Sequence, residues 1–477
     1  MSSTHTPAPQ PLDPLACTTS AFPELSPYIL ASSASTLRTL LSANHTTHHC
    51  FFNTRGMHNH ALHQLVATLT LSASRAQLEQ HYAYQIAHYL GSFALNNRTL
   101  YDPHLPGGSS SIQKVDEGNW TQHVGNARFY WAYLHFFDAQ VAALGLQGVL
   151  EKYVFSAEAN ADGVQMVTRF YGGVLHALIH FGYALEMGVG EVAAEALAMA
   201  ASTAASHAWL FEYTWLTTAP QPGEKTGLLQ LVREMQQDPR LSVDALRLRD
   251  EDASLPNTPF TSRSSAGHGV IQGYIDRWDA QHALPDLALL SALLLGAVPL
   301  HPNGAYKHDF FLMHLNNAHL FTPLFLAHLS PSRAHTFLRA LAAQFAYFYI
   351  CRGRPAFSLP THAEALSWEQ MFSDARANVD EHLPKAVRAL YVFERRYAES
   401  QARLAEAGLL DEGVGEGEVC GSGPQRSWFG CIAGSCSPAG MRRTSRGARA
   451  RVWARIRSFG RSSRSFDLLS HSCTAQW

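Results

Sequence analysis

The feature of this sequence with the most chemical potential is its histidine content, 26 residues in a chain of 477. Imidazole is the commonest metal ligand in proteins, and its ordinary pKa lets it exchange protons near neutral pH. Four short segments combine histidines with apolar residues at helical spacing. Histidines from several helices could therefore converge on one metal site or acid–base site.

The first two segments place histidines at spacings that a helix can use. RGMHNHALH contains His58, His60 and His63 at the start of an apolar helix. Spacings of two and five residues point in different directions, so at most one or two of them reach a common centre, and His60 and His63 are the natural pair. The second segment, GGVLHALIHFGY, holds His176 and His180 four residues apart, a spacing that presents two nitrogens to one metal ion.

The other two segments pair a histidine with a lysine. In KHDFFLMH, Lys307 and His314 are seven residues apart, which is two turns along one helical face. His314 lies in a very apolar run, where a buried imidazole needs a hydrogen bond or a metal ion. In VDEHLPKAVR, His382 and Lys385 fall at a helix start, provided that Pro384 lies in the first turn.

Ordinary structural roles compete with each of these interpretations. A single histidine of this kind is more often a satisfied core residue or a surface residue than a ligand, and Asp380 and Glu381 are typical helix-start acids. The grouping of four segments favours a common site. Nitrogen ligands without thiolates suit iron, copper, zinc or manganese, of which iron and copper react with oxygen. His268, between two glycines in a predicted loop, is a separate acid–base candidate or a solvated loop residue.

The elements that must position these residues are helices. Apolar residues recur every three or four positions from residue 27 to about 406, as in Leu62, Leu65, Val66 and Leu69. We predict an all-α fold, a large multi-helix single domain, with a two-lobed body or an α-solenoid as alternatives. The most apolar stretch, residues 287–300, is too short to span a bilayer and is predicted to be a core helix. Turn-rich breaks are expected at residues 102–111, 218–224, 254–269 and 297–304.

The two ends of the chain differ from this body. Residues 1–24 are predicted to be a flexible leader without a secretory signal, which favours a cytoplasmic location. Residues 25–406 form the predicted catalytic domain, where scattered cysteines offer no disulfide framework. Residues 407–477 form an Arg/Ser/Gly-rich tail that is predicted to be disordered. A basic arm for nucleic acid or membrane, or a misread coding sequence, are alternatives for the tail.

Composition and motifs give no specific support to several function classes. Lys and Arg total 36 against 38 Asp and Glu, a formal charge of −2 that gives no general attraction to nucleic acid or anionic lipid. The GxGxxA match at residues 188–193 follows a predicted helix, where a dinucleotide site needs a strand. No GxSxG elbow, P-loop or CxxC pair occurs. A small uncharged partner fits best, and the aromatic run at residues 130–137 could wall a flat substrate or fill the core.

Taken together, the HNHxxH start, GGVLHALIHFGYALE, KHDFFLMH and WEQMFSDARANVDEHLPKAVRALY resemble the questin oxidase-like family of fungal proteins. The resemblance covers residues 25 to 400 approximately. It implies an oxygenase of secondary metabolism that opens the ring of an anthraquinone-like or anthrone-like aromatic polyketide with dioxygen. Both Baeyer-Villiger-type and dioxygenase-like oxygen insertion are consistent with this resemblance.

The resemblance also implies a nonheme iron (Fe²⁺) site made of histidines and a lysine carboxylated at its tip. The implied ligands are His176, His180, one histidine of the 58–63 segment, and His314 or His382, with Lys385 as the carboxylated lysine. Lys307 is the reserve lysine and, with His268, a candidate catalytic residue. A metal-free oxidase that takes electrons from NADPH and a nonenzymatic helical scaffold remain as alternatives. The sequence does not determine the oligomeric state.

Overall fold

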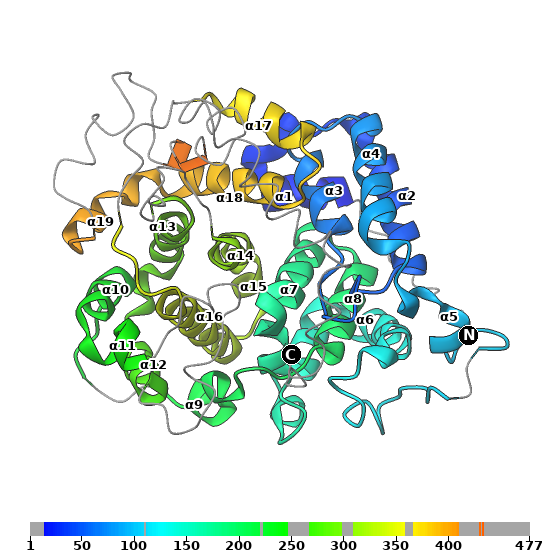
Figure 1. Cartoon of the computed structure of the whole chain (residues 1–477), viewed down its shortest axis with the longest axis horizontal. Coiled ribbons are helices and arrows are strands. Elements are labelled where there is room, and N and C mark those ends of the chain that lie inside the picture. Colours follow the sequence, from blue (N-terminus) through cyan, green and yellow to red (C-terminus); the bar gives the residue numbers. More distant parts are fainter. Residues whose placement is uncertain are drawn as a thin grey trace, which may run out of the picture.

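The described part of the chain is built from helices, as Figure 1 shows, and this confirms the predicted all-α class. Within that part, strand-like pairing is limited to two isolated bridges, Phe51 with His58 and Thr226 with Trp278. The computed structural model describes residues 14–108, 111–219, 223–246, 267–297, 309–357, 366–409, 429–430 and 432–433.

The periodic apolar residues predicted helices, and many of these follow one another through short connections, although residues 102–129 separate α5 from α6. Several are joined by short 3₁₀ or π turns, such as the π turn at Ile86–Leu90 that extends α4. In chain order the α-helices are α1 (Pro14–Ala21), α2 (Ala31–Thr47), α3 (Ala61–Leu69), α4 (Arg75–Gln85), α5 (Arg98–Tyr101), α6 (Tyr130–Tyr153), α7 (Met166–Met187), α8 (Gly190–Ser202), α9 (Tyr213–Thr217), α10 (Leu228–Gln237), α11 (Val243–Leu246), α12 (Gly267–Asp276), α13 (Ala283–Gly296), α14 (Phe310–His319), α15 (Thr322–His328), α16 (Pro331–Cys351), α17 (Trp368–Ala377), α18 (His382–Tyr397) and α19 (Ala402–Glu406).

One part of the core is centred on α8. The sequence of this helix, GEVAAEALAMAAS, is rich in alanine, and every residue from Val192 to Ser202 is buried. Small side chains let neighbouring helices approach closely at native packing density, and α6 and α7 both pack against α8. The only charged residue in this buried stretch, Glu195, is therefore held deep between helices.

A second part of the core is organised around α18, which contacts α3, α13, α14 and α17. In Figure 1 this helix runs across the upper part of the molecule from the α3 side toward α19. It thereby joins the early and late parts of the chain, and α14 also packs against α7. The helices that carry the four histidine segments are neighbours for this reason.

Several local predictions can be compared with these elements. Residues 287–296 of the predicted apolar stretch lie in α13 and are all buried, so this part is a core helix, whereas residues 298–300 lie outside the described part of the chain. None of the described helices is both long enough and apolar enough to cross a membrane. The aromatic run of α6 is buried and its rings pack on one another, as Tyr133 does on Phe137, which favours the core interpretation. The loop prediction for His268 was wrong, because this residue lies in the first turn of α12.

Candidate metal centre

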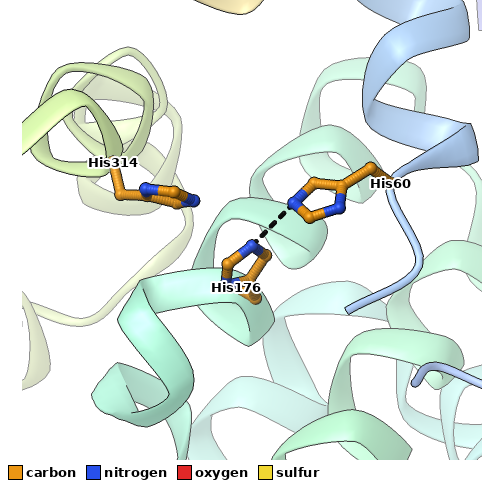
Figure 2. Close-up of side chains that lie close together, drawn as sticks. All are labelled: His60, His176 and His314. Atoms are coloured by element: carbon orange, nitrogen blue, oxygen red, sulfur yellow. Dashed lines mark hydrogen bonds between the residues drawn. The ribbon is translucent and has the colours of Figure 1, made fainter. Parts of the chain in front are cut away.

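Four helices bring histidines to one buried place. His60 lies at the N-terminus of α3, His176 in α7, His314 in α14 and His382 at the first position of α18. One nitrogen each of His60, His176 and His314 lies within 4.8 Å of the others, and all three side chains are buried. Figure 2 shows the three rings, which come from three separate segments and point toward one another.

Hydrogen bonds fix which nitrogens of these rings are available. Nδ1 of His176 donates to the Gly173 carbonyl at 2.5 Å, and Nδ1 of His314 donates to the Phe310 carbonyl at 2.7 Å. Because each ring gives its proton to a backbone oxygen, Nε2 carries the lone pair on both. Nε2 of His60 lies 2.9 Å from Nε2 of His176. Two ligands about 2.1 Å from one ion and at right angles to each other have nearly this separation, about 3 Å.

His382 and Lys385 complete the group from α18. The His382 ring centroid lies 5.0 Å from that of His60 and 5.7 Å from that of His314. Among the described residues, buried Nε2 of His382, Nε2 of His314 and Nζ of Lys385 have no hydrogen-bond partner. Buried polar atoms are rarely left in this state, because the cost of an unmade bond is about 1–3 kcal/mol. Three such atoms beside one another are what a site for a metal ion and its ligands would contain.

The electrostatics of the group favour neutral imidazoles. Burial holds the pKa values of His60, His63, His176 and His314 well below the ordinary value, and the nearby Lys385 charge lowers them further. Neutral imidazole is the form that binds a metal ion. These histidines are therefore ready to coordinate without first losing a proton.

The pKa of Lys385 also departs from its ordinary value. Its side chain is 1% exposed, and burial lowers the pKa of its ammonium to about 8, although the carboxylates of Glu381 and Asp380 oppose this shift. The neutral amine is the nucleophile that reacts with CO₂ to give a carbamate. The group also includes a carboxylate. One ligand atom each of Glu381, His60 and His382 lies within 4.8 Å of the others, so these residues form a second set of potential metal ligands.

The remaining predicted histidines lie around this centre in different roles. The His58 ring stacks on His176, with centroids 3.9 Å apart and an interplanar angle of 4°. The His63 ring contacts His60, and its Nε2 lies 3.1 Å from Nδ1 of His180. Nε2 of His180 donates to Glu195 at 2.8 Å. Both nitrogens of His180 are thus hydrogen-bonded, to His63 and to Glu195. His176 and His180 therefore do not direct both rings to one metal position.

Two predicted catalytic residues cannot be placed beside this site. Lys307 lies outside the described residues. His268 belongs to α12, but its side chain is not among those described.

The chain before His176 has a backbone that most residues avoid. Helix α7 is interrupted at Gly172, and Gly173, Val174 and Leu175 follow with φ values of 52°, 57° and 66°. Left-handed φ costs a side-chain-bearing residue about 1–2 kcal/mol, and strain of this kind clusters at functional sites. The interruption aims His176 at the centre and puts the Gly173 carbonyl within reach of its Nδ1.

This geometry makes Gly173 a sensitive position. A Cβ added there would lie 2.8 Å from Cε1 and 2.9 Å from Nε2 of His58. We expect Gly173→Ala to lower the free energy of unfolding by about 2–4 kcal/mol, since backbone strain adds to the steric clash. Gly163→Ala is the matched control, because its φ is 82° but no described atom lies within 4 Å of the added Cβ. Chemical denaturation should show the larger loss for Gly173→Ala, and equal losses would contradict the proposed contact with His58.

Sequence reasoning missed two residues that the structure brings close to the centre. Glu195 is 3% exposed and accepts hydrogen bonds from His180 and His45. An acidic residue in the middle of an alanine-rich helix was a usable signal, because such a charge is rarely buried without a partner. His45 carried no comparable signal, since it lies in the polar segment NHTTHH.

Comparison with known proteins agrees with the sequence resemblance. The questin oxidase-like family model matches residues 57–390. A Baeyer-Villiger oxidase (AgnL3) of Paecilomyces divaricatus is 26% identical over 393 residues, which cover 76% of this chain and 80% of that protein. A questin oxidase of Aspergillus terreus is 25% identical over 365 residues, covering 74% of this chain and 78% of the relative. A Baeyer-Villiger monooxygenase (AacuH) of Aspergillus aculeatus is 29% identical over 326 residues, which cover 63% of this chain and 64% of that protein.

The match to the family model spans all four histidine segments, and the relatives share an oxidative activity in their names. The buried histidine group is thus found in a chain whose relatives are oxidases and monooxygenases. The chain belongs to the questin oxidase-like family and is an oxidoreductase.

Proposed function

We propose that this enzyme inserts oxygen from dioxygen into a reduced anthraquinone or anthrone-like polyketide and opens its ring, at a nonheme iron site. The observation that carries the proposal is the convergence of His60, His176 and His314, whose ligand atoms lie within 4.8 Å of one another. The names of the relatives, questin oxidase and Baeyer-Villiger oxidase, support the substrate class and the oxygen insertion.

The residues at the centre fit an iron ion. His60, His176 and His314 would hold the metal through Nε2, with His382 as a fourth imidazole. Lys385, once carboxylated, would add an oxygen donor and a negative charge, which a set of neutral histidines lacks. Its buried amine without a partner among the described residues and its pKa of about 8 suit this modification. Iron supplies a redox centre that can activate dioxygen toward an electron-rich ring.

The protein's own groups would prepare the substrate for this reaction. Nδ1 of His63 is buried and has no hydrogen-bond partner among the described residues, so it can accept a hydrogen bond from a phenolic hydroxyl and take its proton transiently. Because burial lowers the pKa of His63, the ring would then pass that proton on. A phenolate is richer in electrons than the phenol and is the more easily oxidised form. Phe310 packs on both His314 and His382, at centroid distances of 4.7 Å and 5.1 Å, and would help to exclude water.

The test is an assay of the purified full chain with Fe²⁺ and a chemically reduced trihydroxyanthraquinone under ¹⁸O₂. Mass spectrometry should find a ring-opened product, with two ¹⁸O atoms for a dioxygenase and one for a monooxygenase. A chelator such as EDTA should abolish product formation, and added Fe²⁺ should restore it. Failure to convert any reduced anthraquinone or anthrone by protein that holds iron would contradict the proposal.

The names of the relatives also favour a second candidate, a metal-free Baeyer-Villiger oxidase that uses NADPH. In that reaction one oxygen atom enters the product, the other leaves as water, and NADPH supplies two electrons. The GxGxxA match gives it no support, because Gly188 is the C-cap of α7 and α8 begins at Gly190. Stoichiometric NADPH consumption that continues in strong chelator would favour this candidate over the iron site.

A further inference from the structure

A chain of three hydrogen bonds and one ion pair leads from the buried centre toward the surface. Nε2 of His63 lies 3.1 Å from Nδ1 of His180, and Nε2 of His180 lies 2.8 Å from Oε2 of Glu195. Oε1 of Glu195 lies 2.8 Å from Nδ1 of His45, and Nε2 of His45 lies 3.4 Å from Oδ2 of Asp138. The side chain of Asp138 is 34% exposed, whereas those of Glu195 and His180 are 4% exposed. Five helices, α3, α7, α8, α2 and α6, contribute one residue each.

We infer that Asp138, His45, Glu195 and His180 form a proton path between solvent and His63. The purpose of the path rests on the proposed function, in which oxidation of the substrate releases a phenolic proton at the buried centre. A centre enclosed by protein needs a route by which a proton released in each turnover reaches solvent. The chain supplies this exit without opening the protein, because every link is an imidazole or carboxylate that can both accept and donate a proton.

The transfer conserves protons along the chain. When a proton binds Nδ1 of His63, the proton on its Nε2 moves to Nδ1 of His180. The proton on Nε2 of His180 then moves to Oε2 of Glu195, and His45 releases its Nε2 proton to Asp138 and water. One proton enters, one proton leaves, and no electron changes place. The rings of His63 and His180 must then turn over, and Glu195 must pass its proton to His45, before the chain can carry another proton in the same direction. The reverse sequence delivers a proton from solvent to the centre.

The charges along the chain support this arrangement. Burial by itself lowers the pKa of His45, but hydrogen bonds with Asp138 and Glu195 raise it to about 10, so this ring carries a proton on each nitrogen. Burial by itself raises the pKa of Glu195, but hydrogen bonds from His180 and His45 lower it to about 2. A buried imidazolium therefore stands between two carboxylates, and it can release its Nε2 proton at the solvent end once a proton that arrives on Glu195 removes one of the charges that raise its pKa.

The other titratable groups near Glu195 do not compete for the proton. Burial raises the pKa values of Cys50, Tyr82 and Tyr130, and the nearby negative charge of Glu195 raises them further. A thiol and two phenols with raised pKa values stay protonated at neutral pH. The acidic and basic links of the chain are consequently the groups that can relay a proton there.

Solvent exchange of imidazole N–H protons tests the path directly. The full chain with Zn²⁺, which is diamagnetic, is labelled with ¹⁵N-histidine, and saturation transfer from water is measured for the N–H signals of His63 and His180. Glu195→Gln identifies the His180 signal by its shift. We expect His45→Asn, which keeps a hydrogen-bond donor near the Nδ1 position but cannot relay, to slow this exchange about tenfold or more, since exchange then requires local opening.

Two controls make the result specific. The N–H proton of His319, which is buried and bonded to the Leu284 carbonyl, should exchange at the same rate in every variant. His88→Gln, on the exposed face of the π turn after α4, should leave all rates unchanged. If His45→Asn does not fold, Asp138→Asn at the surface should slow the same protons to a smaller extent.

Equal exchange rates of His63 and His180 in the wild type and in both solvent-end variants would overturn the proton path. This measurement needs neither iron nor turnover. Its failure is therefore distinguishable from failure of the proposed oxygenase function, which the labelled-oxygen assay reports.

Discussion

Replacement of His176 by alanine is expected to remove the bound iron from a folded protein. The wild type should contain about one iron per chain, because the neutral imidazoles of the centre form one site. His176→Ala deletes the ring that lies 2.9 Å from His60 and packs between His58 and His314. Loss of an outer hydrogen-bonding partner alone weakens metal binding 10–100-fold, so loss of a ligand should exceed about 100-fold. Elemental analysis after gel filtration measures the effect.

A matched control separates metal loss from damage to the core. His319→Ala also removes a buried imidazole of 1% exposure, but that ring bonds to Thr322 and Leu284 instead of the centre. The His319→Ala variant should retain iron, while its free energy of unfolding should fall about as much as that of His176→Ala. Ring opening should fall on the order of 10³-fold in His176→Ala, corresponding to about 4 kcal/mol in the barrier. Full iron content in His176→Ala would show that the ligand set is wrong.

Removal of the amine at residue 385 is expected to have an effect of similar size. Lys385→Arg keeps a positive charge but cannot form a carbamate, since guanidinium remains protonated. We expect it to lose iron and to reduce activity on the order of 10³-fold, about 4 kcal/mol. Lys385→Glu, which supplies a carboxylate, should recover part of the iron. The control Lys152→Arg changes a surface lysine in the same way and should retain both iron and activity.

The lysine also predicts a pH dependence. Burial lowers its folded pKa from 10.5 to about 8, so the neutral amine becomes the main form only as the pH rises through about 8. In metal-free protein at fixed CO₂ pressure, carbamate formation should therefore increase from pH 7 to pH 9. ¹³C NMR with labelled bicarbonate measures the carbamate signal, which Lys385→Arg should lack. A signal that persists in that variant would assign the carbamate to another amine.

Much of this arrangement was predictable from local sequence patterns. Periodic apolar residues were sufficient for the all-α class, and Pro384 was expected in the first turn of a helix, which α18 confirms by beginning at His382. The spacing of His382 and Lys385 at that helix start was also visible. These features depend on residues close in sequence, where helix geometry fixes the relative positions of side chains.

Features that depend on distant contacts were harder to predict. The pair His176 and His180 has a spacing typical of metal ligands, yet in the structure His180 bonds to His63 and Glu195. Only the packing of α7 against α8 brings Glu195 to this position. Likewise, the interruption before His176 depends on left-handed φ at Val174 and Leu175, which their residue types disfavour. Tertiary contacts must stabilise such a backbone, and the spacing of apolar residues in the sequence does not reveal those contacts.

Anomalous diffraction at the iron absorption edge would test the central claim most directly, with crystals of the full chain grown from protein that is active in the labelled-oxygen assay. We predict one strong peak among the Nε2 atoms of His60, His176 and His314, with density for a carbamate on Lys385. Active protein whose crystals show no metal peak at this position would contradict the iron site, and the histidines would then be acid–base or structural residues of a metal-free oxidase.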